Sequence, residues 1–272
     1  MTFQQKLDAI VKKNNSLLCI GLDSELEKLP ERIRSGPKPQ ATFNKAIIYA
    51  TQDLVCAYKP NLAFYEACGT AGIDDLKNTC DFLRAHYPEI PIIIDAKRGD
   101  IGNTNEGYAK FIFDFLGADA VTLQPYLGKE ATKPFLDRKE KGIIILCRTS
   151  NPGSGEFQDL MVDGKPLYQK VAENISKDWN FNGNCGLVVG ATYPTELEIV
   201  RRIVGDMPIL IPGVGAQGGD VEKTVNAGVD GNGKNAMINS SRGILFASNG
   251  LDFAQAARKA AETLKNSINT FR

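Results

Sequence analysis

Short apolar segments alternate along the chain with longer amphipathic segments. The short segments are rich in β-branched residues and bounded by glycine or polar residues, a pattern typical of buried β-strands. Eight strands are predicted, at residues 17–23, 56–61, 92–97, 120–124, 142–149, 186–190, 208–212 and 236–240. A helix is predicted after each strand, at residues 42–55, 74–86, 103–116, 129–140, 166–179, 194–204, 219–227 and 252–268. Residues 1–10 predict an additional amphipathic helix at the N-terminus.

The alternation of strand and helix repeats eight times within 272 residues. This repeat predicts an α/β fold of the (β/α)8 or TIM-barrel type, formed by residues 1–272 as a single domain with an N-terminal helix. An open doubly wound sheet is the alternative, but no G-x-G-x-x-G motif follows the first strand. The chain also has no low-complexity tract or linker that would mark a domain boundary.

Two of the predicted helices begin with capping signals. Pro194 and the acidic residues after it suit a first turn, where proline leaves no N–H unpaired and acids face the positive end of the helix dipole. Asp252, with Gln255 three residues later, predicts a capping box at the start of the last helix.

The connection after the fifth strand is unusually long. Residues 151–165 exceed the roughly two to six residues of a typical strand-to-helix loop and are rich in Gly, Pro and Ser. A surface insertion is one interpretation. The position of the segment at the presumed catalytic end of the barrel favours a mobile lid.

The composition excludes several classes of function. The 32 basic residues balance the 32 acidic residues, so neither nucleic acid nor an anionic membrane is expected as a partner. No apolar run approaches the ~20 residues that span a bilayer, and the N-terminus lacks a signal-peptide core, so a cytoplasmic location is expected. The six cysteines form no C-x-x-C pair and are expected to be reduced. The single histidine, His86, excludes a His-cluster metal site.

The end of the third strand carries the densest group of charged residues. After an apolar run, the sequence DAKRGD at residues 95–100 places Asp95, Lys97 and Asp100 within six residues. If the strand continues to Lys97, the side chains of Asp95 and Lys97 point to the same side. An isolated pair of opposite charges at the mouth of a buried strand would favour a structural ion pair, but the second aspartate and the helix start GNTN at residues 102–105 favour an active site. A divalent metal is not required, although Asp95 and Asp100 are able to hold one.

Polar residues also follow the other strands, at the end of the barrel where catalytic groups are expected. They include Asp23, Lys59, Asn61, Thr149 and Ser150. The glycine-rich segment 212–220 exposes backbone N–H groups before a short helix, and Arg242 follows the last strand. Together these two features predict a phosphate site, because loops seven and eight usually form it in this fold.

The motif DAKRGDIGNT at residues 95–104, with Lys59 on the preceding strand, resembles the orotidine 5′-phosphate decarboxylase family. The segment PGVGAQGG at residues 212–219 and Arg242 are similar to the phosphate site of that family, and Asp23 and the Thr149–Ser150 pair also match. The resemblance covers about residues 15 to 250. The segment after Ser150 looks like the bacterial subgroup with a long fifth loop.

The resemblance implies cofactor-free decarboxylation of orotidine 5′-monophosphate to UMP, the final step of de novo pyrimidine nucleotide synthesis. Asp95 would lie against the substrate carboxylate, and Lys97 would protonate C6 of the pyrimidine. Lys59 and Asp100 would complete an alternating charge network. The enzyme would be a homodimer with shared active sites, because Asp100, Ile101 and Thr104 would reach into the partner subunit's site.

The resemblance also implies the remaining substrate contacts. Asp23, Lys59 and Thr104 would contact the ribose, Asn61 would join this polar network, and Ser150, beside Thr149, would bind the pyrimidine amide edge. Pro212 would form a wall for the base. The phosphate would be held by Gln217 and Arg242, with Ser241 and Gly243 flanking the arginine; many relatives carry glycine in place of Ser241.

Two other functions stay open at this point. Relatives that share Asp-x-Lys-x-x-Asp include metal-dependent decarboxylases and aldolases that act on sugar phosphates. A non-catalytic nucleotide-binding barrel is the third hypothesis, and the complete set of Lys59, Asp95, Lys97 and Asp100 argues against it.

Overall fold

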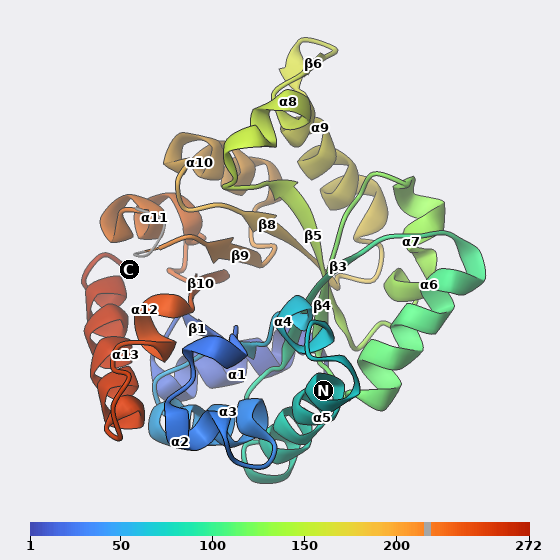
Figure 1. Ribbon diagram of the computed structural model, residues 1–272. Coiled ribbons are helices and arrows are strands. Elements are labelled where there is room, and N and C mark those ends of the chain that lie inside the picture. The colour runs from blue at the N-terminus through green and yellow to red at the C-terminus, as the bar shows by residue number, and fades with distance from the viewer. Residues whose placement is uncertain (215–218) are drawn as a thin grey trace.

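Eight parallel strands form a barrel in the computed structural model, which describes residues 1–214 and 219–272 (Figure 1). The strands are β1 (Leu18–Gly21), β2 (Ala57–Lys59), β3 (Ile93–Arg98), β4 (Ala120–Leu123), β5 (Gly142–Arg148), β8 (Cys185–Val189), β9 (Ile209–Pro212) and β10 (Ala236–Ser240). Their order in the sheet is β2-β1-β10-β9-β8-β5-β4-β3. Parallel bridges from Tyr58 to Ile92 and from Asn61 to Asp95 join β2 to β3 and complete the ring. The predicted barrel and its eight strands are confirmed.

Helices surround the barrel, and all those predicted are present. They are α1 (Phe3–Asn14), α3 (Pro39–Thr51), α5 (Gly69–His86), α6 (Gly102–Ala109), α7 (Gly128–Leu136), α9 (Leu167–Asn174), α10 (Pro194–Val204), α11 (Val221–Gly228) and α13 (Phe253–Thr270). Two of them continue as π-helix, α6 into η2 (Lys110–Phe115) and α9 into η4 (Ile175–Trp179). Short helices that the sequence pattern does not predict lie in the connections, namely η1 (Leu26–Lys28), α2 (Glu31–Arg34), α4 (Leu62–Glu66) and α12 (Arg242–Leu245).

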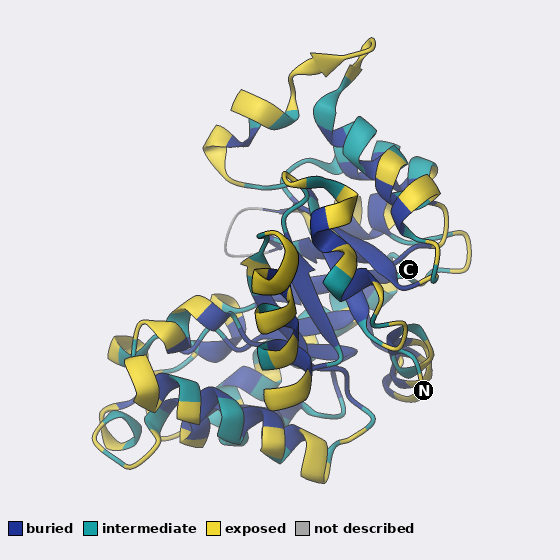
Figure 2. Ribbon diagram, turned by 90° about the vertical axis from the view of Figure 1, so that its right-hand side faces the viewer, coloured by how far each residue is buried: buried dark blue, intermediate teal, exposed yellow. Residues whose placement is uncertain are grey.

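The hydrophobic core fills the barrel and the layer between strands and helices. Figure 2 shows the strands as buried and the outer faces of the helices as exposed. Residues of β1, β4 and β8 are buried on both faces, as expected for parallel strands with helices outside and side chains packed inside. All six cysteines are free thiols, and five of them are buried. No helix in residues 1–214 or 219–272 has the length and apolar character needed to cross a membrane.

The two predicted helix starts have different outcomes. Pro194 is the first residue of α10, as predicted. The capping box at Asp252 is wrong, because the Asp252 side chain makes no capping hydrogen bond to α13. Its backbone has φ −87° and ψ 9°, which is not the extended conformation of a capping residue, and its Oδ1 accepts a hydrogen bond of 2.6 Å from Ser248 Oγ.

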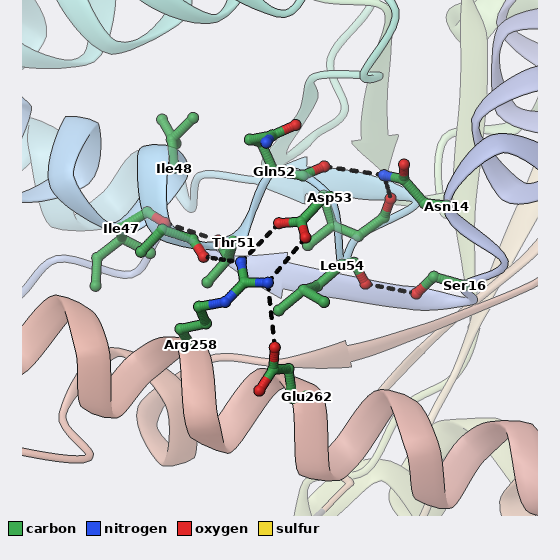
Figure 3. A network of polar contacts seen from close by, with 12 residues as sticks. Asn14, Ser16, Ile47, Ile48, Thr51, Gln52, Asp53, Leu54, Arg258 and Glu262 are labelled. Atoms are coloured by element: carbon green, nitrogen blue, oxygen red, sulfur yellow. Dashed lines mark hydrogen bonds and ion pairs between the residues drawn. The ribbon is translucent and has the colours of Figure 1, made fainter.

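One arginine links the last helix to the first half of the chain through a network of polar contacts (Figure 3). Arg258 of α13 donates to both carboxylate oxygens of Asp53, with Nη1–Oδ1 at 2.7 Å and Nη2–Oδ2 at 2.9 Å. Nη1 also donates to the carbonyl of Ala50, and Nη2 lies 3.1 Å from Glu262 Oε1. These contacts hold α13 against the end of α3 and the segment that leads into β2.

The long connection after β5 contains short elements of its own. They are η3 (Pro152–Ser154), α8 (Gly155–Gln158) and an antiparallel hairpin of β6 (Met161–Val162) and β7 (Lys165–Pro166). The hairpin projects away from the barrel (Figure 1). The irregular loop expected over residues 151–165 is therefore partly ordered into secondary structure, and its mobility stays a prediction.

Candidate active site

A cavity of about 470 Å³ opens at the carboxyl ends of the strands. Its lining includes most of the residues that the sequence places in the site, namely Asp23, Lys59, Asn61, Asp95, Lys97, Thr149, Ser150, Pro212, Ser241 and Arg242. They lie on or just after six of the eight strands, namely β1, β2, β3, β5, β9 and β10. The barrel therefore brings together residues that lie far apart in the sequence.

Asp95 lies at the centre of a charge network at the base of the cavity. Its Oδ2 is 3.1 Å from Lys59 Nζ, and its Oδ1 is 2.6 Å from Lys97 Nζ. Thr122 Oγ1 on the neighbouring strand donates a further hydrogen bond of 2.8 Å to Oδ1. Asp95 is thus held by two ammonium groups and a hydroxyl, which satisfy a carboxylate that is only 8% exposed.

The charges in this network stabilise one another. Burial alone raises the pKa of Asp95, but the ammonium groups of Lys59 and Lys97 outweigh burial and hold that pKa well below its ordinary value. Burial alone lowers the pKa of Lys59, but the carboxylates of Asp95 and Asp23 outweigh it and raise that pKa. The Asp95 carboxylate and the Lys59 ammonium therefore both stay charged throughout the neutral pH range. Burial raises the pKa of the nearby Cys19 thiol to about 12, so Cys19 is neutral.

The backbone of Lys97 is left-handed, with φ of 48°. The register between β3 and β4 shifts between Ile94 and Arg98, which marks a bulge at this point. The predicted regular alternation of Asp95 and Lys97 is therefore replaced by a bulge, although both side chains do meet in the cavity. The Lys97 N–H donates to Thr122 Oγ1 at 3.0 Å, so one threonine holds both the carboxylate and the bulged backbone.

Asp23 contributes a second carboxylate to the cavity. Its Oδ1 lies 3.9 Å from Lys59 Nζ and accepts no hydrogen bond from the residues that the structure describes. Buried hydrogen bonds hold both neighbours of Asp23 in the sequence. The Tyr65 hydroxyl donates to the Leu22 carbonyl at 2.7 Å, and the Ser24 hydroxyl donates to the side-chain oxygen of Asn44. A buried acceptor in a rigid setting is suited to receive a hydrogen bond from a ligand.

One end of the cavity has the character of an anion site. Arg242 begins the short helix α12, is exposed, and its guanidinium makes no hydrogen bond or ion pair with the described part of the chain. The Ser241 side chain packs on Gly21, where an added Cβ would lie only 2.0 Å from Ser241 Oγ and would displace that hydroxyl. Gly243 follows in α12 outside the cavity lining. Gln217 lies outside the described residues.

Three predicted site residues lie outside the cavity of their own chain. Asp100, Ile101 and Thr104 follow β3, but they are not part of the cavity lining given by the described residues. Asp100 is partly buried, and its Oδ1 accepts a hydrogen bond of 2.7 Å from the Ile101 N–H. Ile101 is 59% exposed, an unusual position for isoleucine.

Sequence reasoning missed several residues of the cavity wall. Asn151 and Gln158 come from the long connection after β5, and Asn239 comes from β10. Asn239 is buried, yet its Oδ1 has no hydrogen-bond partner among the described residues. A polar residue inside an otherwise apolar strand, as in AMINS at residues 236–240, is the signal that identifies Asn239. Apolar residues Leu146, Val188, Leu210 and Val214 complete the wall.

Comparison with known proteins identifies the family. Residues 16–260 match the model of the "Orotidine 5'-phosphate decarboxylase / HUMPS family". Proteins named orotidine 5′-phosphate decarboxylase from Janthinobacterium sp. (strain Marseille) and Cellvibrio japonicus (strain Ueda107) are 52% and 53% identical to this chain. The alignments cover all of this chain, with 99% of the first relative and 100% of the second.

Solved structures agree with the sequence comparison. The structure of Leishmania donovani OMP decarboxylase superposes with a TM-score of 0.86 and 37% sequence identity, covering 100% of this chain and 99% of that chain. An orotidine-monophosphate-decarboxylase structure from Toxoplasma gondii has a TM-score of 0.87 and 37% identity, with 98% and 97% of the two chains covered. The barrel with its Lys59–Asp95–Lys97 network is therefore a member of the orotidine 5′-phosphate decarboxylase / HUMPS family.

Proposed function

We propose that this protein decarboxylates orotidine 5′-monophosphate to UMP and CO2, without a cofactor, in the last step of de novo UMP synthesis. The observation that carries the proposal is Asp95 held between two lysine ammonium groups at the base of a cavity that has an arginine at its rim. The names of the relatives support the same reaction.

The chemistry at C6 is assigned to Lys97 and Asp95. Loss of CO2 leaves an electron pair at C6, and the Lys97 ammonium stabilises that developing charge and then transfers its proton there. The Asp95 carboxylate lies against the substrate carboxylate, and the repulsion between them is relieved as neutral CO2 forms. Lys59 keeps Asp95 ionised, which is consistent with their separation of 3.1 Å.

The rest of the cavity binds the parts of the substrate that do not react. Asp23, Lys59 and Asn61 contact the ribose, Ser150 and Thr149 bind the pyrimidine edge, and Pro212 walls the base. Arg242 holds the phosphate, together with Gln217, Ser241 and Gly243. Contacts distant from C6 supply binding energy that offsets the crowding of the two carboxylates.

The metal-dependent alternative is less compatible with the site. Both oxygens of Asp95 already contact ammonium groups, so a divalent cation there would meet two positive charges. Within residues 1–214 and 219–272, no three His, Cys, Asp or Glu side chains are grouped as a metal site. A non-catalytic nucleotide-binding barrel has no need for Lys97 in a strained backbone conformation against Asp95.

The assembly and location belong to the same proposal. The protein acts as one barrel domain in a homodimer, in which Asp100, Ile101 and Thr104 enter the partner subunit's site. The position of these residues outside their own cavity and the exposure of Ile101 support this assignment. A cytoplasmic location is consistent with six free thiols.

The direct test is the absorbance change of orotidine 5′-monophosphate with purified protein that has been treated with EDTA. Full turnover after chelation is expected. Turnover that depends on an added divalent metal would support the metal-dependent alternative, and UMP binding without any turnover would support the non-catalytic one.

A further inference from the structure

Arg148, the last residue of β5, is a buried cation that the chemistry described above does not use. Its side chain is only 3% exposed. The guanidinium stacks on the ring of Tyr193, with Cζ 4.0 Å from the ring centroid. Tyr193 immediately precedes α10, at the end of the connection from β8. A buried guanidinium is costly unless its N–H groups are hydrogen-bonded, and its partners therefore indicate its role.

Among the described residues, the hydrogen-bond acceptors of the Arg148 side chain all lie in the connection that follows β5. Nη1 donates to Ser154 Oγ, to Gln158 Oε1 at 3.3 Å and to the Thr149 carbonyl at 3.3 Å. Nη2 donates to Asp159 Oδ2 at 3.1 Å. The arginine therefore holds the beginning of the connection, η3 and α8 at once, which requires the planar, forked arrangement of its donors.

The groups that Arg148 holds form one wall of the cavity. Gln158 lines the cavity and is bonded on both sides of its amide, since Oε1 accepts from the Thr149 N–H at 2.9 Å and Nε2 donates to Thr149 Oγ1 at 2.8 Å. Thr149 Oγ1 in turn donates to Asn151 Oδ1 at 2.7 Å. Ser150 lies between them and also lines the cavity. Displacement of the connection would therefore move the whole wall at residues 149–158.

We propose that Arg148 is a positioning residue: by holding the connection after β5 against the barrel, it sets the wall that binds the pyrimidine end of the nucleotide. Arg148 itself does not line the cavity in the described part of the chain, so it acts through Thr149, Ser150 and Gln158. This inference rests on the proposed function, because that function assigns residues 149 and 150 to the base.

The test compares two ligands that differ in the base. UMP carries pyrimidine, ribose and phosphate, whereas ribose 5-phosphate lacks the base. For Arg148→Met, which keeps the side-chain length but removes every donor, the Kd of UMP is expected to rise roughly tenfold or more, because small displacements of a binding group are costly. The Kd of ribose 5-phosphate is expected to stay unchanged. Arg148→Lys is expected to restore part of the UMP affinity, since an ammonium reaches some of the acceptors but has no planar fork.

Arg258→Met is the matched control. It also removes an arginine that donates several hydrogen bonds, but Arg258 does not line the cavity given by the described residues. It is expected to leave both dissociation constants unchanged. If Arg148→Met does not fold, Asp159→Asn and Ser154→Ala weaken the same attachment one contact at a time, and each is expected to raise the Kd of UMP alone. Unchanged UMP affinity in these variants, or an equal loss of affinity for both ligands, would overturn the proposal. Both readouts are binding constants, so absence of turnover in the wild-type protein would refute the proposed function without deciding the role of Arg148.

Discussion

Lys97 Nζ lies 2.6 Å from Asp95 Oδ1, although the two residues are separated by a single position on the same strand. In a regular strand such residues are about 6.6 Å apart at the backbone, with roughly parallel side chains. The left-handed backbone of Lys97 and the bulge in β3 turn the lysine onto the carboxylate. A non-glycine residue in this conformation is strained, and its presence here indicates that the position of the ammonium is more important than local backbone stability.

Removal of the Lys97 ammonium is expected to abolish turnover while nucleotide binding persists. Lys97→Ala and Lys97→Met should each lower kcat by about 10³-fold or more, because a preorganised charge at the reacting carbon is lost. UMP should still bind, since its phosphate and ribose contacts are intact. Turnover is measured by substrate absorbance and UMP affinity by calorimetry. Near-normal kcat in either variant would remove Lys97 from the mechanism.

Shared active sites predict that two inactive variants restore activity when mixed. Lys59→Ala and Asp100→Ala each damage every site of their homodimers. In a heterodimer, one site contains neither native residue and the other contains both. Random subunit exchange should therefore recover about a quarter of the native sites. Recovery is measured after co-refolding, with heterodimers verified by a size tag; heterodimers without activity would contradict shared sites.

The charge network predicts how stability and rate depend on pH. The pKa of Asp95 is lowered on folding, so its stabilising contribution is present above its unfolded pKa of about 4 and is lost as the pH falls through the folded value. The pKa of Lys59 is raised, so its contribution is present below an unfolded pKa of about 10.4 and is lost as the pH rises through the folded value. Neither group is expected to titrate in the kcat profile between about pH 5 and pH 9.

The stability part of this prediction has its own measurement. Asp95→Asn lacks the titrating carboxylate, so its deficit in unfolding free energy relative to the wild type should shrink as the pH is lowered from 7 toward 3. Denaturant unfolding at several pH values tests this. A deficit that is constant over that range would show that folding does not lower the pKa of Asp95, and a deficit that grows as the pH falls would show that Asp95 is protonated in the folded protein.

Arg242 is expected to act on the phosphate alone. Arg242→Ala should raise the KM for orotidine 5′-monophosphate by about 30-fold or more, as expected for charge-assisted hydrogen bonds. Orotidine, which has no phosphate, should be decarboxylated by variant and wild type with equal kcat/KM. A comparable loss with both substrates would mean that Arg242 supports the cavity in another way.

The attachment of α13 is expected to affect stability only. Arg258→Ala removes the two hydrogen bonds to Asp53 shown in Figure 3, and should lower the unfolding free energy by about 1 kcal/mol, because the pair is partly solvent-exposed. The kcat and KM should match the wild type. A change in either constant would show that the position of α13 is coupled to the cavity.

The periodicity of apolar residues was sufficient to predict the barrel, because strands buried on both faces, such as GIIILCR of β5, leave an unambiguous signal. The short helices that were missed in the connections, namely η1, α2, α4 and α12, have three to five residues each, too few for a helical period to repeat. The capping box at Asp252 failed because the nearby Ser248 hydroxyl competes for the same carboxylate. Local sequence does not reveal such competition.

The candidate site was predictable where polar residues end a strand, as at Asp23, Lys59 and Asp95. Gln158 was not, because it lies ten residues beyond Arg148 in a segment without a strand or helix pattern, and only its contacts with Arg148 and Thr149 bring it to the cavity. The bulge at Lys97 was equally invisible, since lysine seldom adopts a left-handed conformation and the sequence contains no glycine at that position.

The pairing of β1 with β10 places Asp23 and Arg242 in the same cavity, although they come from opposite ends of the chain. During synthesis, β1 leaves the ribosome long before β10, its partner on one side of the ring, has been translated. The cavity that Asp23 and Arg242 line together is therefore incomplete during the early stages of folding, and a nucleotide that needs both residues cannot assist those stages. A product terminated before Arg242 would retain Lys59, Asp95 and Lys97 but have no complete pocket in which to use them.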